Sequence, residues 1–380
     1  MSAKEERNID LKYKKVVNVL NKAGEFPIPF SDVLLKILKH TIKVEELDFI
    51  LAFRRNISQT MEQLKESSKL SEEEILKNVS NLAKMGVIFD QPNRRGVMIY
   101  RLLPIIRQSE YIFMQKLEKT EENKELAILF NKLHEELKKS FNMNQDALTE
   151  FLKTLPPIDR TVPTLENKDG DSIEISIDKE LDIPLEEILP TQRIEDLIKK
   201  YDEIAAGHCY CRHQKHFLGE PCKQIELEVE NCFTLGKSAR HTSKHGFSRM
   251  VSQEEALEIL KKSEKAGLVH KAYHLYSDTS KEEVAICNCC KCCCINSRSH
   301  AFIPLNNSTN WVAQIDQNVC TGCGTCVEKC HNDAIELNDD DRAERIEEYC
   351  IGCGVCALHC PENAISLIQN KRIVNIIPKD

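Results

Sequence analysis

Eighteen cysteines are the residues of this 380-residue chain most able to do chemistry. None lies before Cys209, and all of them fall between that residue and Cys360. Clustered cysteines can bind soft metals and metal clusters, or they can pair as disulfides. The start of the chain has no apolar signal-peptide core, so we expect a reducing, cytoplasmic setting, in which metal ligation is favoured over structural disulfides.

The last part of the chain contains one cysteine pattern twice. The segment CTGCGTCVEKCHNDAIEL (320–337) aligns without gaps with CIGCGVCALHCPENAISL (350–367). Both copies read C-x2-C-x2-C-x3-C, and glycines recur at matching places, where they permit positive φ angles and let amides approach the sulfides. This is the ligand run of a bacterial ferredoxin with two [4Fe-4S] clusters, in which the fourth cysteine of each run binds the other cluster.

The spacing predicts two ligand sets. One consists of Cys320, Cys323, Cys326 and Cys360, and the other of Cys350, Cys353, Cys356 and Cys330. A pair of zinc sites is the alternative, but structural zinc usually takes two separated cysteine pairs rather than four cysteines in one short run. His331 stands where the run usually has proline, as Pro361 does in the second copy. We expect this change to affect the potential of that cluster more than its presence.

Ten further cysteines precede the repeat. They are Cys209, Cys211, Cys222 and Cys232, followed by Cys287, Cys289, Cys290, Cys292, Cys293 and Cys294 in the stretch CNCCKCCC. Side chains alternate between the faces of an extended segment, so Cys290, Cys292 and Cys294 should share one face. Cys287, Cys289 and Cys293 should then share the other. We expect this stretch to form a wall between two further [4Fe-4S] clusters, with the four earlier cysteines in the same unit and two thiols left over.

The alternating geometry makes one cysteine of a vicinal pair dispensable, because adjacent side chains of extended backbone cannot both face one iron. A polynuclear zinc or other thiolate cluster and a redox-active dithiol patch are the alternatives for this region. Five nearby histidines could replace a thiolate, although cluster irons favour sulfur. They are His208, His213, His216, His241 and His245. Arg212 would either raise the potential of a nearby cluster or lie on the surface.

The order of these motifs resembles a family of multi-cluster 4Fe-4S proteins from anaerobic bacteria and archaea. The shared elements are C-x-C-R at 209–212, two later cysteines, a stretch like HGFSRMVSQEEALEILKKSEKAGLVH (245–270), the CNCC-x-CCC run and a terminal dicluster ferredoxin domain. The resemblance implies electron transfer without naming a reaction. Within that stretch, a capping box of Ser252 and Glu255 predicts a helix over 252–266, which we expect to cover the ligand loops as a lid.

The first two hundred residues must hold elements that position these sites. Helical apolar periods occur at 31–42, 43–55, 57–68 and 71–86, and a β-hairpin follows. This order resembles a winged helix-turn-helix domain over 31–104. Residues 31–103 hold twelve Lys and Arg against ten Asp and Glu, and the last helix begins with three glutamates. Both features argue against a DNA-binding surface.

These patterns predict an α+β, multidomain fold. Its parts are a lead segment (1–30), a winged-helix-like domain (31–104), a mostly helical connector with one possible strand at 173–177 (105–205), a cysteine-rich cluster-binding domain (206–305) and a ferredoxin-like βαββαβ dicluster domain (306–380). A helix at the end of the connector should lead directly into Cys209. The net charge of −8 gives no general reason to expect nucleic acid as a partner, and no apolar run approaches a membrane span.

The sequence contains no phosphate loop, dinucleotide-binding turn or catalytic triad. We therefore expect an electron-transfer protein with at least two and up to four [4Fe-4S] clusters, not an enzyme by itself. It would be a carrier or a subunit of a larger oxidoreductase, and its partners would be redox proteins. A redox-responsive winged-helix regulator of transcription is the alternative, and an enzyme with an open iron site in the middle region is a third.

Overall fold

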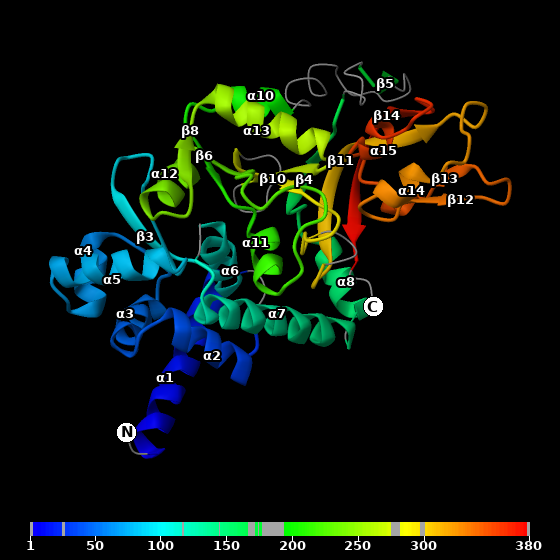
Figure 1. The fold of residues 1–380 in the computed structure, drawn as a ribbon. Coiled ribbons are helices and arrows are strands. Elements are labelled where there is room, and N and C mark those ends of the chain that lie inside the picture. The colour runs from blue at the N-terminus through cyan, green and yellow to red at the C-terminus, as the bar shows by residue number, and fades with distance from the viewer. Residues whose placement is uncertain are drawn as a thin grey trace.

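The structure, a computed structural model, describes residues 3–24, 27–115, 118–143, 145–165, 172–173, 175–176, 194–274, 282–296 and 301–377. A helical N-terminal part with a small sheet adjoins a nine-stranded sheet that runs through the rest of the molecule (Figure 1).

The N-terminal part contains five α-helices and three short strands among its described residues. The helices are α1 (Ala3–Leu20), α2 (Asp32–Thr41), α3 (Leu47–Leu51), α4 (Met61–Ser68) and α5 (Glu72–Lys84). The strands β1 (Ser58–Gln59), β2 (Ile88–Pro92) and β3 (Met98–Leu102) pair in the order β1-β3-β2. The predicted helices are present, although the helix expected at 43–55 is short. The 18-residue helix α1 lies in the lead segment, where we expected no element.

Local signals explain where these helices begin. The Ser71 hydroxyl accepts a hydrogen bond from the Glu74 amide, and the Glu74 carboxylate accepts one from the Ser71 amide, so α5 begins with a capping box. Leu34, Ile37 and Leu38 of α2 are fully buried at helical spacing. The apolar core that they join also contains Cys211 and Cys232, so it reaches into the cysteine-rich region.

The large sheet has the strand order β5-β14-β11-β4-β9-β10-β7-β6-β8. Its strands are β4 (Asp159–Val162), β5 (Ile175–Ser176), β6 (Ile204–Gly207), β7 (Cys232–Leu235), β8 (Arg249–Val251), β9 (Val269–His274), β10 (Glu283–Cys289), β11 (Leu305–Ile315) and β14 (Ile365–Ile376). Strand β4 lies between β11 and β9, so one sheet joins the cysteine-rich region to the C-terminal part. β5 falls within the strand expected at 173–177, of which residues 174 and 177 lie outside the described residues.

Helices cover both faces of this sheet. On one face lie α10 (Ile194–Lys199) and α13 (Gln253–Lys265), whose apolar side chains pack against Ile204, Phe233 and Ile286. On the other lie α6 (Ile105–Met114), α7 (Glu121–Asn142) and α11 (Tyr210–Phe217), while α8 (Gln145–Lys153) and α12 (Lys237–Lys244) flank it (Figure 1). The expectation that a helix leads directly into Cys209 is wrong, because β6 lies between α10 and that residue.

The C-terminal part follows the order β11, α14 (Thr325–Lys329), β12 (Ile335–Leu337), β13 (Ala343–Arg345), α15 (Val355–Leu358) and β14. This is the expected βαββαβ order. β11 and β14 form a long antiparallel ribbon, and β12 and β13 form a separate hairpin. Among the described residues, no helix combines the length and apolar character needed to cross a membrane.

Candidate functional site

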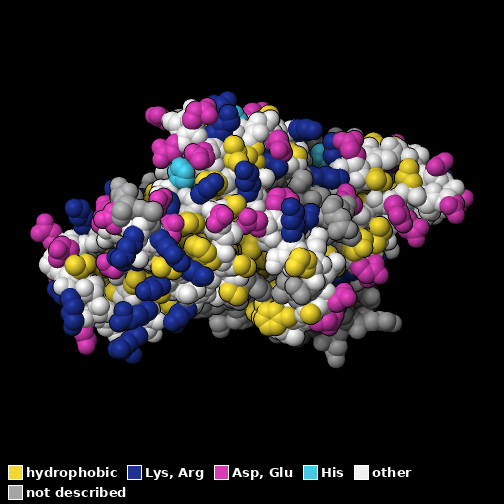
Figure 2. Space-filling view, turned by 90° about the horizontal axis from the view of Figure 1, so that it is seen from below, with side chains coloured by type: hydrophobic (Ala, Val, Ile, Leu, Met, Phe, Trp, Pro, Cys, Tyr) yellow, Lys and Arg dark blue, Asp and Glu magenta, His cyan; other side chains and the backbone are white. Residues whose placement is uncertain are grey.

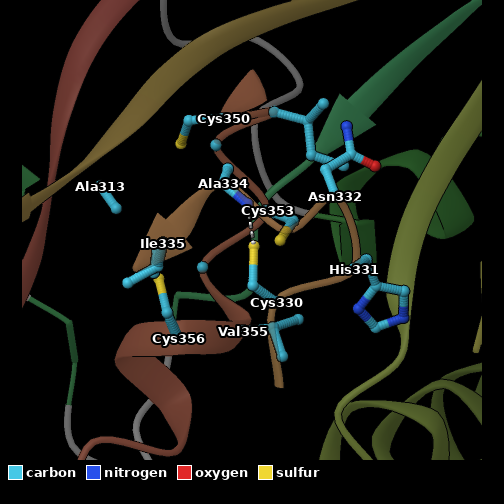
Figure 3. Close-up of a pocket in the computed structure, with 13 residues that line it drawn as sticks. Ala313, Cys330, His331, Asn332, Ala334, Ile335, Cys350, Cys353, Val355 and Cys356 are labelled. Carbon is cyan, nitrogen blue, oxygen red and sulfur yellow. Dashed lines mark hydrogen bonds between the residues drawn. The ribbon is translucent and has the colours of Figure 1, made fainter. Parts of the chain in front are cut away.

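Two hollows in the C-terminal part are each lined by four cysteines. Cys330, Cys350, Cys353 and Cys356 surround a hollow of about 370 Å³, which Ala313, Ile335 and Val355 help to close (Figure 3). Cys320, Cys323, Cys326 and Cys360 surround a second hollow of about 340 Å³. Each hollow combines three cysteines of one run with the fourth cysteine of the other. That crossed arrangement suits two cubane clusters.

Glycines and backbone amides shape these hollows. A Cβ on Gly322, where φ is +71°, would lie 1.9 Å from the Asp341 carbonyl oxygen, so only glycine fits there. The Ala334 amide donates to Cys330 Sγ at 3.1 Å, and the Ala364 amide donates to Cys360 Sγ at 3.3 Å. Amide donors of this kind stabilise negatively charged sulfur, which is the form that binds iron.

The two hollows differ in their access to solvent. Cys323 is exposed, and a hydrogen bond with Thr325 lowers the pKa of its thiol. In the other hollow, burial raises the pKa of Cys353 to about 12 and that of Cys356 well above its ordinary value. We therefore call the Cys350 set the inner site and the Cys320 set the outer site.

The structure divides the ten middle cysteines into two groups. The six-thiol group contains Cys209, Cys211, Cys232, Cys287, Cys289 and Cys294, and the four-thiol group contains Cys222, Cys290, Cys292 and Cys293. Both groups therefore draw on the spread-out cysteines as well as on the stretch at 287–294.

Neighbouring thiols connect the members of the six-thiol group. Burial and hydrogen bonds with Cys209 and Cys294 raise the pKa of Cys211 well above its ordinary value. Hydrogen bonds with Cys287 and Cys294, together with burial, raise the pKa of Cys289 in the same way. A hydrogen bond with Cys232 and burial also raise the pKa of Cys287. The six thiols thus form a continuous, largely buried string.

Strand alternation explains how β7 and β10 contribute to this group. Phe233 and Ile286 point into the core beneath α10 and α13, and the two residues pair directly. Their neighbours Cys232 and Cys287 therefore point to the opposite face, where Cys289 also lies two residues further on. Cys209 and Cys211 reach this face from the start of α11.

We expected side chains to alternate between two faces throughout 287–294, and this expectation is wrong beyond Cys289. β10 ends there, and residues 291–293 form a turn. The turn brings Cys292 and Cys293 to the same side, with their Sγ atoms 3.5 Å apart, and returns Cys294 toward Cys211. Both members of this vicinal pair face one site, so the argument that one of them is dispensable does not apply to this pair.

Arg212 lies between the two groups and is only 1% exposed, so it is not a surface residue. Its guanidinium donates to the Glu226 carbonyl at 3.0 Å and also to the Asn231 side chain. Although burial opposes its charge, the nearby thiols of Cys209, Cys290 and Cys222 raise the pKa of Arg212. It therefore supplies a permanent positive charge next to both groups.

The nearby histidines make other contacts. His241 and His245 both contact Asp90 of β2, at 3.0 and 2.7 Å. His213 Nδ1 lies 2.9 Å from the Phe113 carbonyl, and His208 Nδ1 lies 3.2 Å from the Leu227 carbonyl. His216 packs edge-on against the Phe217 ring.

His331 joins the six-thiol group to the inner site. Its Nε2 donates to the Cys289 carbonyl at 2.9 Å, and its side chain is buried. Cys353 of the inner site packs in one apolar cluster with Cys287, Cys289 and Cys294. Sequence reasoning missed this contact, although the loss of proline at 331 in one copy of the repeat was a signal that the residue has another role.

The predicted helix at 252–266 is present as α13, but it covers the thiols only at its C-terminal end. The Ser252 hydroxyl accepts from the Glu255 amide as predicted, whereas the Glu255 carboxylate accepts from Arg249 at 2.6 Å. The capping box is therefore half formed. Leu268, just after the helix, packs against Cys290 and Cys293 of the four-thiol group.

Comparisons with known proteins match the C-terminal part. A family model described as a 4Fe-4S dicluster domain matches residues 313–367. A protein named probable ferredoxin from Methanosarcina thermophila is 55% identical over 29 residues, which cover 8% of this chain and 50% of that protein. The chain thus spans about half the length of the curated relative it matches. No solved structure matches the chain. The C-terminal part therefore contains a 4Fe-4S dicluster domain that is similar in sequence to a ferredoxin.

Proposed function

We propose that this protein carries electrons between redox proteins through the two [4Fe-4S] clusters of its dicluster domain and a third iron–sulfur centre in the six-thiol group. The observation that carries the proposal is the shared apolar cluster of Cys353, Cys289 and Cys294. Electrons that move between the inner site and the six-thiol group would cross only packed side chains and the hydrogen bond of His331. The outer site, with Cys323 exposed, would exchange electrons with a partner.

Surface charge suggests the kind of partner. Acidic side chains gather at the end of the molecule that carries the dicluster domain (Figure 2). Exposed acidic residues of the β12–β13 hairpin belong to this end, among them Asp339, Asp340 and Asp341. A redox protein with a basic docking surface would be attracted to them, and its association would weaken with salt. We infer a carrier, or a subunit of a larger oxidoreductase, in the cytoplasm.

Metal analysis and spectroscopy of the anaerobically purified full chain test this function. The dicluster domain accounts for about eight irons, and a third cubane-sized centre would bring the total to about twelve. Dithionite reduction should give an EPR spectrum with more spin–spin broadening in the wild type than in Cys211→Ser, because a third centre in the six-thiol group would adjoin the inner site. An iron content of about eight per chain in both the wild type and Cys211→Ser would contradict the third centre.

A redox-responsive regulator is the second candidate, and one observation favours it. The core of the winged-helix-like N-terminal part contains Cys211 and Cys232, so a change in the six-thiol group would reach its helices. Lys and Arg side chains also gather over this part of the molecule (Figure 2). Against it, the exposed Glu72, Glu73 and Glu74 occupy the start of α5, where a recognition helix would enter a DNA groove.

Fluorescence anisotropy with labelled duplex DNA decides between the candidates. The full chain is needed, because the N-terminal part shares its core with the cysteine-rich region. Affinity that falls steeply with salt and differs between oxidised and reduced protein would favour the regulator. The carrier hypothesis requires neither the salt dependence nor the redox dependence. If the full chain does not bind DNA at low salt, the regulator hypothesis is wrong.

A further inference from the structure

The four-thiol group is much more closely spaced than the ferredoxin sites. The Sγ atoms of Cys222, Cys290, Cys292 and Cys293 all lie within 4.8 Å of one another. Cys222 Sγ and Cys293 Sγ each lie 3.5 Å from Cys292 Sγ. The group forms where the loop after α11 meets the turn after β10.

These separations match the size of one tetrahedral metal ion. With metal–sulfur bonds of about 2.3 Å, the corners of a tetrahedral thiolate site lie about 3.8 Å apart. In a cubane, each of the four thiolates binds a different iron, so the sulfurs must surround the whole inorganic core. The dicluster sites of the same structure show that second arrangement, with their cysteines spread around hollows of about 340 and 370 Å³.

The surroundings of the group suit a site with negative charge. Four thiolates around a divalent ion carry a net charge of −2, and buried Arg212 lies beside Cys222 and Cys290. The Lys223 amide donates to Cys292 Sγ at 3.4 Å. Ile225 and Leu268 pack against Cys290 and Cys293, which keeps water from that side of the site. Charge, donors and packing are therefore all arranged around the four sulfurs.

We propose that Cys222, Cys290, Cys292 and Cys293 bind a single zinc ion in a closed tetrahedral site. Each thiol loses its proton to solvent as it binds, and no ligand position is left open for a substrate. The ion would fasten the loop after α11 to the turn that directs Cys294 into the six-thiol group. This site is separate from the proposed electron path and replaces the second of the two cubanes expected for the middle cysteines.

Metal analysis of the anaerobically purified full chain, expressed with both iron and zinc in the medium, tests the site. We expect about one zinc per chain beside the cluster iron. Cys222→Ser and Cys293→Ser should each lower zinc content about tenfold and leave the eight irons of the dicluster domain unchanged. The matched control is Cys211→Ser in the six-thiol group, which should leave zinc unchanged whatever happens to iron.

Two further measurements remain informative if the serine variants do not fold. Cys222→His retains a zinc ligand and should keep the zinc. Wild-type protein loaded with Co²⁺ should show the absorption of a tetrahedral thiolate site, and Cys222→His should shift that absorption as nitrogen replaces sulfur. Wild-type protein without zinc, a single iron in place of zinc, or a loss of about four irons in Cys222→Ser at unchanged zinc content would overturn the proposal. The eight irons of the dicluster domain report separately on the proposed electron-transfer function.

Discussion

Two glycines of the outer site offer a matched pair of substitutions. Gly322 has φ +71° and Gly324 has φ +74°, so alanine at either position costs about 1–2 kcal/mol in backbone strain. They differ in the space around them. A Cβ at Gly322 would lie 1.9 Å from the Asp341 carbonyl oxygen, whereas one at Gly324 would meet nothing within 4 Å. Relief of the clash to an ordinary contact needs a movement of about 1.5 Å.

That movement should reach the outer site. Asp341 lies in the β12–β13 turn, close to Ala343, whose amide donates to Cys320 Sγ at 3.5 Å. We expect Gly322→Ala to lose about four irons per chain, the content of one cubane, and to lose the corresponding EPR signal. Gly324→Ala should keep its iron and unfold at a slightly lower denaturant concentration. Equal iron in the two variants would refute the reasoning from backbone contact.

Three other substitutions test contacts around the thiol groups. His331→Pro restores the usual ferredoxin residue, and the variant should keep the dicluster iron. Its free energy of unfolding should fall by about 1–3 kcal/mol, because the Cys289 carbonyl loses a buried donor. Denaturant titration with iron analysis measures both. Arg212→Gln should make the reduction potential of the nearest iron–sulfur centre more negative by roughly 50–100 mV in an EPR-monitored redox titration. Arg212→Lys retains the charge and should change this potential less. Burial lowers the pKa of His134 to about 4, below its value of about 6.5 in the unfolded chain. This residue alone should therefore contribute about 1 kcal/mol to the stability that the wild type loses as pH falls from 7.5 to 5.5. His134→Phe should remove this loss, and an unchanged pH dependence of unfolding would contradict the assignment.

The dicluster domain could be predicted from sequence because its ligand pattern is local. Each run places three thiols on one tight loop, and the two glycine positions require no knowledge of the rest of the fold. The division of the middle cysteines could not be predicted in the same way. It depends on the turn at 291–293, where Cys292 meets Cys222, a residue 70 positions earlier in the chain.

The prediction for the N-terminal part failed for a different reason. Tyr13, Val16, Val17 and Leu20 are buried in α1, and their spacing is helical, so the signal for this helix was present in the sequence and overlooked. The continuity of the large sheet had no comparable signal. β4 pairs Asp159 with Asn307 on one side and with Tyr273 on the other, and such long-range pairing is set by the packing of the whole fold.

The apolar cluster that Cys353 shares with Cys289 and Cys294 has an electrostatic consequence for electron uptake. An electron added to the inner cluster increases negative charge in apolar surroundings, where charges interact more strongly than in water. The next reduction of an adjoining centre in the six-thiol group would then be less favourable, and the measured potentials would belong to the pair rather than to either centre. Reduction would therefore be anticooperative. The protein would accept its electrons one at a time over a broad range of potential, which suits a one-electron relay better than a store that discharges pairs.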